Sequence, residues 1–73
     1  MNAKQITFEV LDTLPEVPFS GAYLAGKVCG IEGRIHYPDT ILRYMREWRK
    51  KREKFDIVLV DKKKSIYKKI KRS

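Results

Sequence analysis

Apolar residues recur with a helical period over three stretches of the chain, and the first of these is N-terminal. Ile6, Val10 and Leu14 are spaced four residues apart, which places them on one face of a helix. Pro15 ends this helix because a proline ring is not tolerated in a helix interior. The pattern therefore predicts a first helix over residues 3–14.

A second helix is predicted after an extended connector over residues 16–19. The prolines of this region exclude the connector from a central position in a sheet. Ser20 is a suitable N-cap, because its hydroxyl can accept hydrogen bonds from the free amides of the first turn. Gly30 and Gly33 are expected to close the helix, since glycine readily adopts the positive φ of a C-cap. The expected apolar face is narrow and consists of Leu24, Ala25 and Val28, with Cys29 as a small buried hydrophobe.

The third stretch runs from Pro38 to about Glu53 and has the strongest amphipathic pattern. Pro38 suits the first helical position, where its missing amide is not needed, and Asp39 favours the positive end of the helix. The apolar stripe consists of Ile41, Met45 and Trp48, with Leu42 at its edge. The opposite side carries Asp39, Arg43, Glu47, Lys50 and Lys54, flanked by Thr40 and Arg46. This helix is predicted to have one buried stripe and one broad, mainly cationic side.

After residue 54 the pattern changes from helical to alternating. Residues 55–60 are rich in β-branched side chains, and residues 65–70 form a second short strand. The polar segment 61–64 between them predicts the tip of an antiparallel hairpin. An isolated hairpin is only marginally stable in water, so it must pack on the helices. The side chains expected to do so are Phe55, Ile57, Leu59, Ile66 and Ile70.

Length and composition exclude several classes of protein. The 73 residues suffice for one small domain, with a basic tail expected to fray from about residue 71. A single cysteine excludes an internal disulfide, and one cysteine with one histidine cannot form a Cys/His zinc site. We expect no metal, no cofactor and no enzymatic activity, because the sequence shows no nucleophile–base pair, paired carboxylates or glycine-rich phosphate loop. No apolar run is long enough for a membrane span and no signal peptide is visible, which favours a cytoplasmic protein.

The positive charge is concentrated in the second half of the chain. Residues 1–33 carry two lysines against four acidic residues, whereas residues 34–73 carry fifteen basic residues against five acidic ones. The two parts therefore have net charges of −2 and +10 within a total of +8. Such segregation creates a positive field over one part of the surface and favours a polyanionic partner. The alternative is that the surplus of lysine only increases solubility.

The order of these elements resembles that of the winged helix-turn-helix family. Residues 37–49 look like its recognition helix, and residues 61–67 look like its wing. The resemblance covers nearly the whole chain and implies an α+β fold of three helices and a two-stranded antiparallel hairpin. It also implies a small regulator of transcription or recombination, of prokaryotic or phage type, that binds double-stranded DNA. The sequence departs from the family in its eight-residue turn over residues 30–37, where Ile31 and Ile35 could pack on the core.

The resemblance places the third helix in the major groove and the wing on the backbone or the adjacent groove. Thr40 and Arg43 are then expected to contact base edges, because the N-terminal residues of a recognition helix reach them. The complete set of predicted DNA-binding residues is Arg34, Tyr37, Thr40, Arg43, Tyr44, Arg46, Lys50, Lys62, Lys63 and Lys64.

These residues also have an ordinary structural interpretation. The cations of the third helix could form a solvated face, with Glu47 paired to Lys50 or Lys51. Tyr44 and Tyr67 could be packing residues. The three lysines of the tip could serve only to protect the hairpin from edge pairing.

Two other functions remain open besides DNA binding. A module for protein–protein contact within a nucleic-acid-associated complex requires an exposed apolar patch. Tyr23, Ile31, Ile35 and Tyr37 are the candidates for such a patch. RNA binding through shape and phosphate contacts would use the same positive field. A chain of this length makes few base contacts alone, so we expect weak binding, a second copy on DNA or a partner protein.

Overall fold

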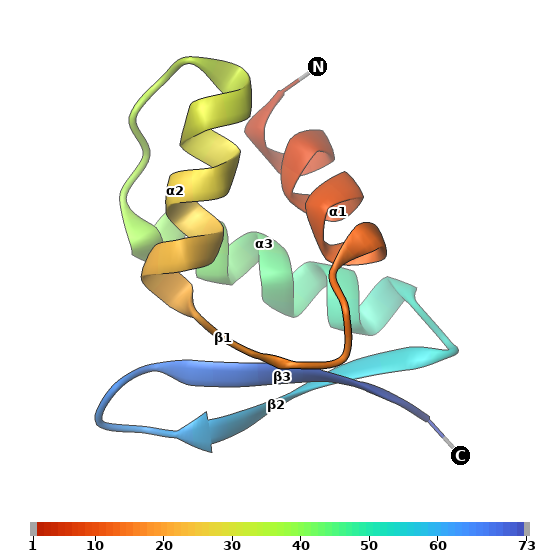
Figure 1. Cartoon of the computed structure of the whole chain (residues 1–73). Coiled ribbons are helices and arrows are strands. Elements are labelled where there is room, and N and C mark those ends of the chain that lie inside the picture. The colour runs from red at the N-terminus through yellow and green to blue at the C-terminus, as the bar shows by residue number, and fades with distance from the viewer. Residues whose placement is uncertain (1, 73) are drawn as a thin grey trace.

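The computed structural model describes residues 2–72 and contains three helices and three strands (Figure 1). The strands form one antiparallel sheet in the order β1-β3-β2. The predicted α+β class with three helices is confirmed. In chain order the elements are α1 (Ala3–Thr13), β1 (Pro18–Ser20), α2 (Gly21–Glu32), α3 (Pro38–Lys51), β2 (Phe55–Asp61) and β3 (Ile66–Lys71).

The prediction of only two strands is wrong, because the connector after α1 contributes a third. Pro18 lies opposite Lys68 and Ser20 lies opposite Ile66, so β1 adds to the free side of β3. A proline is tolerated there because β1 is an edge strand, whose outward side needs no ladder partner. Proline therefore excludes this segment from a central position, as expected, but a proline can still be part of an edge strand.

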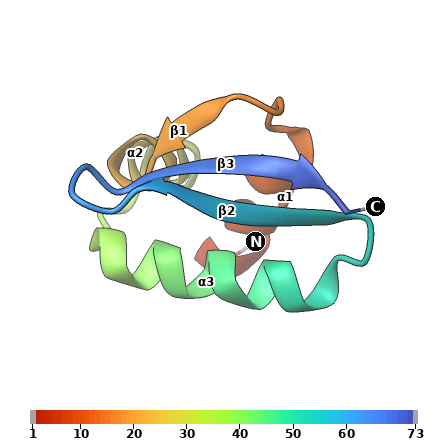
Figure 2. The same ribbon diagram turned by 90° about the horizontal axis from the view of Figure 1, so that it is seen from below.

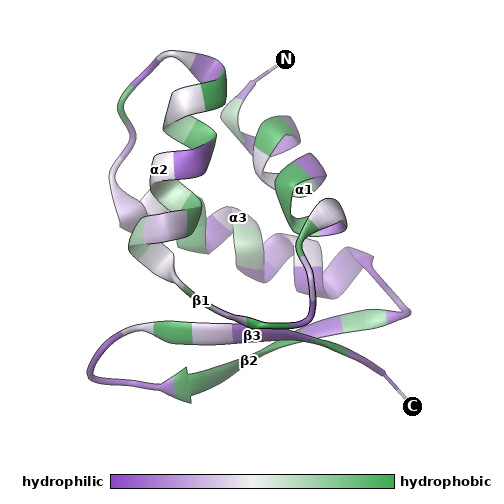
Figure 3. Ribbon diagram, viewed as in Figure 1, coloured by the Kyte–Doolittle hydropathy of each residue, from purple (hydrophilic) through white to green (hydrophobic). Residues whose placement is uncertain are grey.

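The helices pack together against the sheet and enclose a single core. α1 and α2 lie over one face of the sheet, while α3 runs alongside β2 (Figures 1 and 2). Trp48 and Ile41 from α3 are fully buried, as the predicted stripe requires. Towards its C-terminal end α3 becomes largely hydrophilic (Figure 3). The remaining buried apolar residues are Ala3, Ile6, Val10, Leu11, Leu14, Phe19, Leu24, Ala25, Val28, Met45 and Ile57.

The ends of α2 show which of the predicted caps the fold uses. Ser20 accepts a hydrogen bond from the amide of Tyr23 at 2.9 Å, which confirms it as the N-cap. Gly33 is the C-cap with φ of 78°, in the left-handed region that favours glycine. The same role predicted for Gly30 is wrong, because α2 continues through it to Glu32.

The connection from α2 to α3 is consequently shorter than predicted. It spans residues 33–37, five residues in place of eight. Of the two roles open to Ile31 and Ile35, the structure excludes packing on the core, because their exposed fractions are 60% and 96%. The loop is held by polar contacts instead. The amide of His36 donates to Cys29 Sγ at 3.2 Å, and His36 Nε2 lies 2.6 Å from Glu32 Oε2. Cys29 is therefore half-buried and hydrogen-bonded, and not simply a small buried hydrophobe.

The hairpin places only part of its predicted apolar set against the helices. Ile57 is buried and Phe55 packs against the core, as expected. Leu59 is half exposed, so its predicted burial is wrong. On β3 the buried residue is Lys69, at 3% exposure, so neighbouring Ile70 points to the opposite face of the sheet.

Lys69 is buried because it completes the end of α1. Its Nζ donates to the carbonyl oxygens of Leu11 at 2.9 Å, Asp12 at 3.1 Å and Leu14 at 3.2 Å. The last carbonyls of a helix have no intrahelical partner, and an ammonium group there also suits the negative end of the helix dipole. The same Nζ lies 4.5 Å from the centre of the Phe55 ring. Lys69 thus joins α1 to the hairpin.

A second polar cluster joins the end of α1 to the end of α3. Asp12 accepts hydrogen bonds from Arg52 Nε and Nη2, each at 2.9 Å, and from Trp48 Nε1 at 2.8 Å. The hydrogen bonds from Arg52 lower the pKa of Asp12, against a smaller opposing effect of burial. This cluster fixes the end of α3, which stops at Lys51 and not at the predicted Glu53.

Candidate functional site

A row of cations follows the exposed side of α3. Arg43, Arg46 and Lys50 are spaced three or four residues apart and are all exposed, which puts them on one side of the helix. We call these three residues the outer face of α3. None of them forms an ion pair with another residue in the described range 2–72.

The acidic residue expected to neutralise this face points elsewhere. Glu47 pairs with Lys4 of α1 at 2.9 Å, so the predicted pairing with Lys50 or Lys51 is wrong. The ammonium group of Lys4 lowers the pKa of Glu47, which keeps its carboxylate ionised in this ion pair. The bridge links α1 to α3 and leaves the outer face of α3 without that anionic neighbour.

The predicted site residues near the start of α3 differ in accessibility. Tyr37 is the N-cap residue with an exposed fraction of 82%, and Arg34 in the preceding loop is also exposed. Thr40 is half-buried in the first turn. Tyr44 packs partly buried against the core, as the packing interpretation of this residue expects, and Tyr67 does the same.

The predicted wing is a tight turn that projects from the sheet. Lys62, Lys63 and Lys64 are all exposed in it. Asp61 Oδ1 accepts a hydrogen bond from the Lys64 amide at 3.2 Å, and Ser65 closes the turn with φ of 51°. The turn lies at the same end of the molecule as the α2–α3 loop and the start of α3 (Figures 1 and 2). The fold therefore brings two separate predicted basic segments to one end.

The opposite end of α3 holds a basic recess that the sequence did not indicate. Its lining consists of Arg46, Arg49, Lys50 and Arg72, and we call it the α3 recess. Arg49 was assigned no role from the sequence, and Arg72 belongs to the segment expected to fray. In the structure Lys71 is the last residue of β3, and the Arg72 amide donates to the Lys54 carbonyl at 2.9 Å. Ser73, the end of the predicted tail, lies outside the described residues.

Asp56 orients two of the arginines at the α3 recess. Arg49 Nε donates to Asp56 Oδ1 at 2.6 Å, and Arg72 Nη2 lies 3.7 Å from the same oxygen. Partial burial opposes ionisation of this carboxyl group. The hydrogen bonds from Arg49 and the Ile57 amide, with the charge of Arg72, outweigh that effect and lower the pKa of Asp56. No sequence pattern links Arg49, Asp56 and Arg72, because only strand pairing brings them together.

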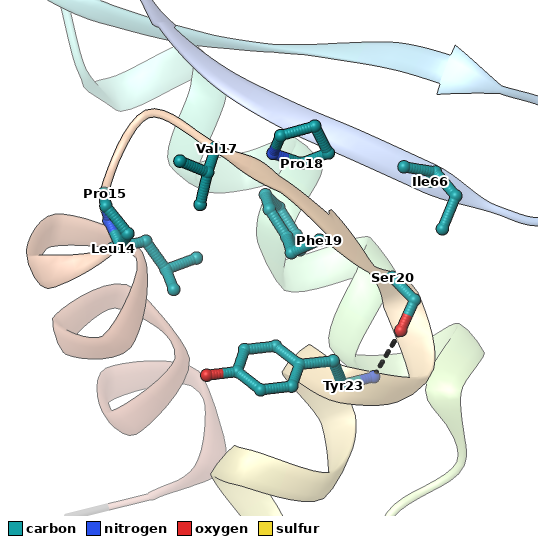
Figure 4. Close-up of a pocket in the computed structure, with 8 residues that line it drawn as sticks. All are labelled: Leu14, Pro15, Val17, Pro18, Phe19, Ser20, Tyr23 and Ile66. Carbon is teal, nitrogen blue, oxygen red and sulfur yellow. Dashed lines mark hydrogen bonds between the residues drawn. The ribbon is translucent and has the colours of Figure 1, made fainter.

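An apolar pocket opens where β1 passes between the ends of α1 and α2 (Figure 4). Tyr23 lies across it with an exposed fraction of 52%, and Val17 at its rim is 53% exposed. Of the four residues predicted for an apolar patch, Tyr23 lies here, whereas Ile31, Ile35 and Tyr37 follow towards the start of α3. All four are exposed. The pocket lining is Leu14, Pro15, Val17, Pro18, Phe19, Ser20, Tyr23 and Ile66.

Within residues 2–72, no group of three or more His, Cys, Asp or Glu side chains is placed to hold a metal ion. Over the same residues, none of the helices has both the length and the apolar character of a membrane span. Comparison of the chain with protein-family models, with curated proteins and with solved structures finds no match. The functional argument therefore depends on the surface chemistry of the chain itself.

Proposed function

We propose that the protein is a winged helix-turn-helix domain that binds double-stranded DNA. The observation that carries the proposal is the row of cations on the outer face of α3, which has no acidic partners within residues 2–72, combined with the lysine tip at the same end as the start of that helix. The element order α1-β1-α2-α3-β2-β3, with an edge strand before α2, agrees with this fold assignment. A small regulator of transcription or recombination is the corresponding biological role.

The chemistry of duplex DNA suits this arrangement. The major groove admits one α-helix, and lysine and arginine contacts to phosphates release counterions and provide most of the non-specific affinity. In the proposed complex, the start of α3 enters the major groove. Thr40 and Arg43 then face base edges, and a bidentate contact from Arg43 to guanine contributes about 1–3 kcal/mol of discrimination. Lys62, Lys63 and Lys64 contact the backbone beside the groove.

Binding of labelled random-sequence duplex DNA, measured by fluorescence anisotropy at increasing salt, tests the proposal. About five phosphate contacts give a log–log slope near −4.5, and hence an affinity loss of roughly 500-fold between about 50 and 200 mM salt. Arg43→Gln and a triple alanine variant at Lys62, Lys63 and Lys64 should each reduce this slope. Lys27→Gln is the control for Arg43→Gln, because it removes the same charge from the exposed side of α2.

The outcomes separate this function from its alternatives. Wild-type protein that does not bind duplex DNA at low salt refutes the proposal. If Arg43→Gln and Lys27→Gln weaken DNA binding equally, a diffuse positive field attracts the DNA and Arg43 makes no specific contact. Tighter binding of an RNA duplex than of a DNA duplex would favour the RNA alternative.

A protein-contact function is the second candidate, and the exposure of Ile31, Ile35 and Tyr37 favours it. Exposed apolar surface marks protein interaction sites where it is contiguous, and these three side chains are each more than half exposed. If DNA binding fails, a double variant Ile31→Ser and Ile35→Ser should abolish capture of a partner that the wild-type chain retains. Normal DNA binding by that double variant would instead show that these residues are not needed for the first function.

A further inference from the structure

We infer that the α3 recess binds a backbone phosphate of the DNA duplex, so that the footprint extends along the whole of α3. The inference rests on the proposed DNA-binding function and adds a second contact at the far end of the helix. It assigns a role to Arg49 and Arg72, which lie outside the set of residues predicted from the sequence.

Internal hydrogen bonds hold the two arginines of the recess in place. Arg72 Nε donates to the Phe55 carbonyl and its Nη2 donates to the Arg49 carbonyl, both at 2.9 Å. Arg49 Nε donates to Asp56. A guanidinium group carries five N–H donors, so these bonds use a minority of the donors on each arginine. The side chains are thus ordered before a ligand arrives, which lowers the entropy lost on binding.

The charge of the recess favours an anion with several oxygen atoms. All four lining residues are cationic, and Asp56 is the one carboxylate that contacts them among the described residues. Repulsion among the four positive charges falls when an anion enters. Arginine matches phosphate through paired N–H bonds, and lysine adds a point charge. The negative end of the α3 dipole lies nearby and opposes an anion, so side chains and not helix amides must provide the attraction.

The position of the recess identifies a DNA strand as the source of the phosphate. The 14 residues of α3 correspond to a length of about 21 Å at 1.5 Å per residue. The major groove is about 12 Å wide, so a helix whose start contacts bases extends beyond the groove edge. Arg46 and Lys50 belong both to the outer face of α3 and to the α3 recess, which makes the two basic regions continuous. A strand bordering the groove can therefore reach the recess.

Charge-neutral variants on duplexes of two lengths test this inference. A double variant Arg49→Gln and Arg72→Gln removes the two cations that belong to the recess and not to the outer face of α3. The matched control, Lys54→Gln with Lys71→Gln, removes two exposed cations from the neighbouring surface at the same end. On a duplex of about 16 base pairs, the recess variant should reduce the salt slope by about 1, since the recess holds one phosphate and each phosphate contact contributes about 1. At about 100 mM salt this corresponds to an affinity loss of roughly 10-fold, and the control should lose less than about 3-fold.

Duplex length provides a second, independent readout. A duplex of about 6 base pairs spans about 20 Å, so about 10 Å of duplex lies on either side when the helix start contacts its central base pairs. This is less than the length of α3, about 21 Å, and leaves no phosphate for the recess. The recess variant and the wild type should then bind this short duplex within about 3-fold of each other. Melting curves check that all variants are folded. Arg72→Gln alone leaves the hydrogen bond between Arg49 and Asp56 in place and should still reduce the slope on the longer duplex, by less than about 1.

Each result supports or overturns a specific statement. Absence of duplex binding by the wild type overturns the proposed function itself. Salt-dependent binding that is sensitive to Arg43→Gln, but equal for the recess variant and its control, overturns only the recess contact. Binding of inorganic phosphate alone, abolished in the recess variant and unchanged by saturating duplex DNA, also overturns the assignment to a DNA strand.

Discussion

Replacement of Lys69 by methionine should strongly destabilise the fold, although lysine is seldom a core residue. Methionine has a similar length and apolar stem but no hydrogen-bond donor. The carbonyl oxygens of Leu11 and Leu14, which are buried acceptors of Lys69, then lose their partner. These oxygen atoms stay buried in the variant because β3, which covers them, remains paired with β1 and β2.

The magnitude follows from the groups left unsatisfied. Each buried carbonyl without a partner costs about 1–3 kcal/mol. Loss of the contact between the ammonium and the Phe55 ring adds about 0.5–2 kcal/mol. Methionine avoids the desolvation of an ammonium group, which offsets part of this cost. We therefore expect a decrease of about 2–4 kcal/mol in the free energy of unfolding, out of a total of about 4–11 kcal/mol for a chain of this size.

Thermal and urea unfolding followed by circular dichroism measures the effect. For a domain of this length, the expected loss lowers Tm by about 10–25 °C. The control is Lys68→Met, because Lys68 is the half-exposed neighbour on the opposite side of the strand. If Lys69→Met melts within about 2 °C of the control, the carbonyl oxygens have found other partners and the reasoning is wrong.

Three further predictions concern single residues. Asp12→Asn should lower stability at about pH 7 and reduce the loss of stability on acidification. The hydrogen bonds from Arg52 lower the pKa of Asp12 below 3.8, so its contribution is present above about pH 4 and is lost as the pH falls through the lowered pKa. Gly33→Ala should destabilise the fold by about 1–2 kcal/mol, because its φ of 78° is strained for alanine. Gly30→Ala should instead stabilise it by about 0.5–1 kcal/mol, because Gly30 is inside α2 with open space around it. Urea unfolding measures the change in the free energy of unfolding for both glycine variants. Equal changes would contradict the assignment of Gly33 as the C-cap and of Gly30 as a residue inside α2.

Helices were predictable from the sequence because their signal is local. The spacing of Ile41, Met45 and Trp48 defines the buried stripe of α3 without reference to other elements, and all three are buried. The N-cap at Ser20 is equally local. The two glycines near the end of α2 were not distinguishable, since either could adopt a positive φ. The structure shows α2 continuing through Gly30 and ending before Gly33.

Features that depend on pairing between distant segments were not predictable. β1 has three residues and a proline, so its strand character appears only when β3 offers a free edge. Alternation along β3 favoured Ile70 as the inward residue, but the open carbonyls at the end of α1 select Lys69. Among the candidate binding residues, exposure was predictable for the outer face of α3. The proximity of the recess residues Arg49 and Arg72 was not predictable, because 23 positions separate them along the chain.

The distribution of acidic residues gives the strongest reason to regard the positive surface as functional. Glu47 binds Lys4, Asp12 binds Arg52, and both pairs connect α1 to α3. Glu47 and Asp12 are thus engaged in internal bridges, and Asp39 in the first turn is the acidic residue of α3 outside these bridges. Within residues 2–72, the cations of the outer face have no acidic partners. A surplus of lysine that served solubility alone would be best distributed with both signs interspersed on the exposed side of the helix. The engagement of Glu47 instead leaves a cationic surface from Arg43 to the α3 recess, and such a surface is stabilised by a polyanion.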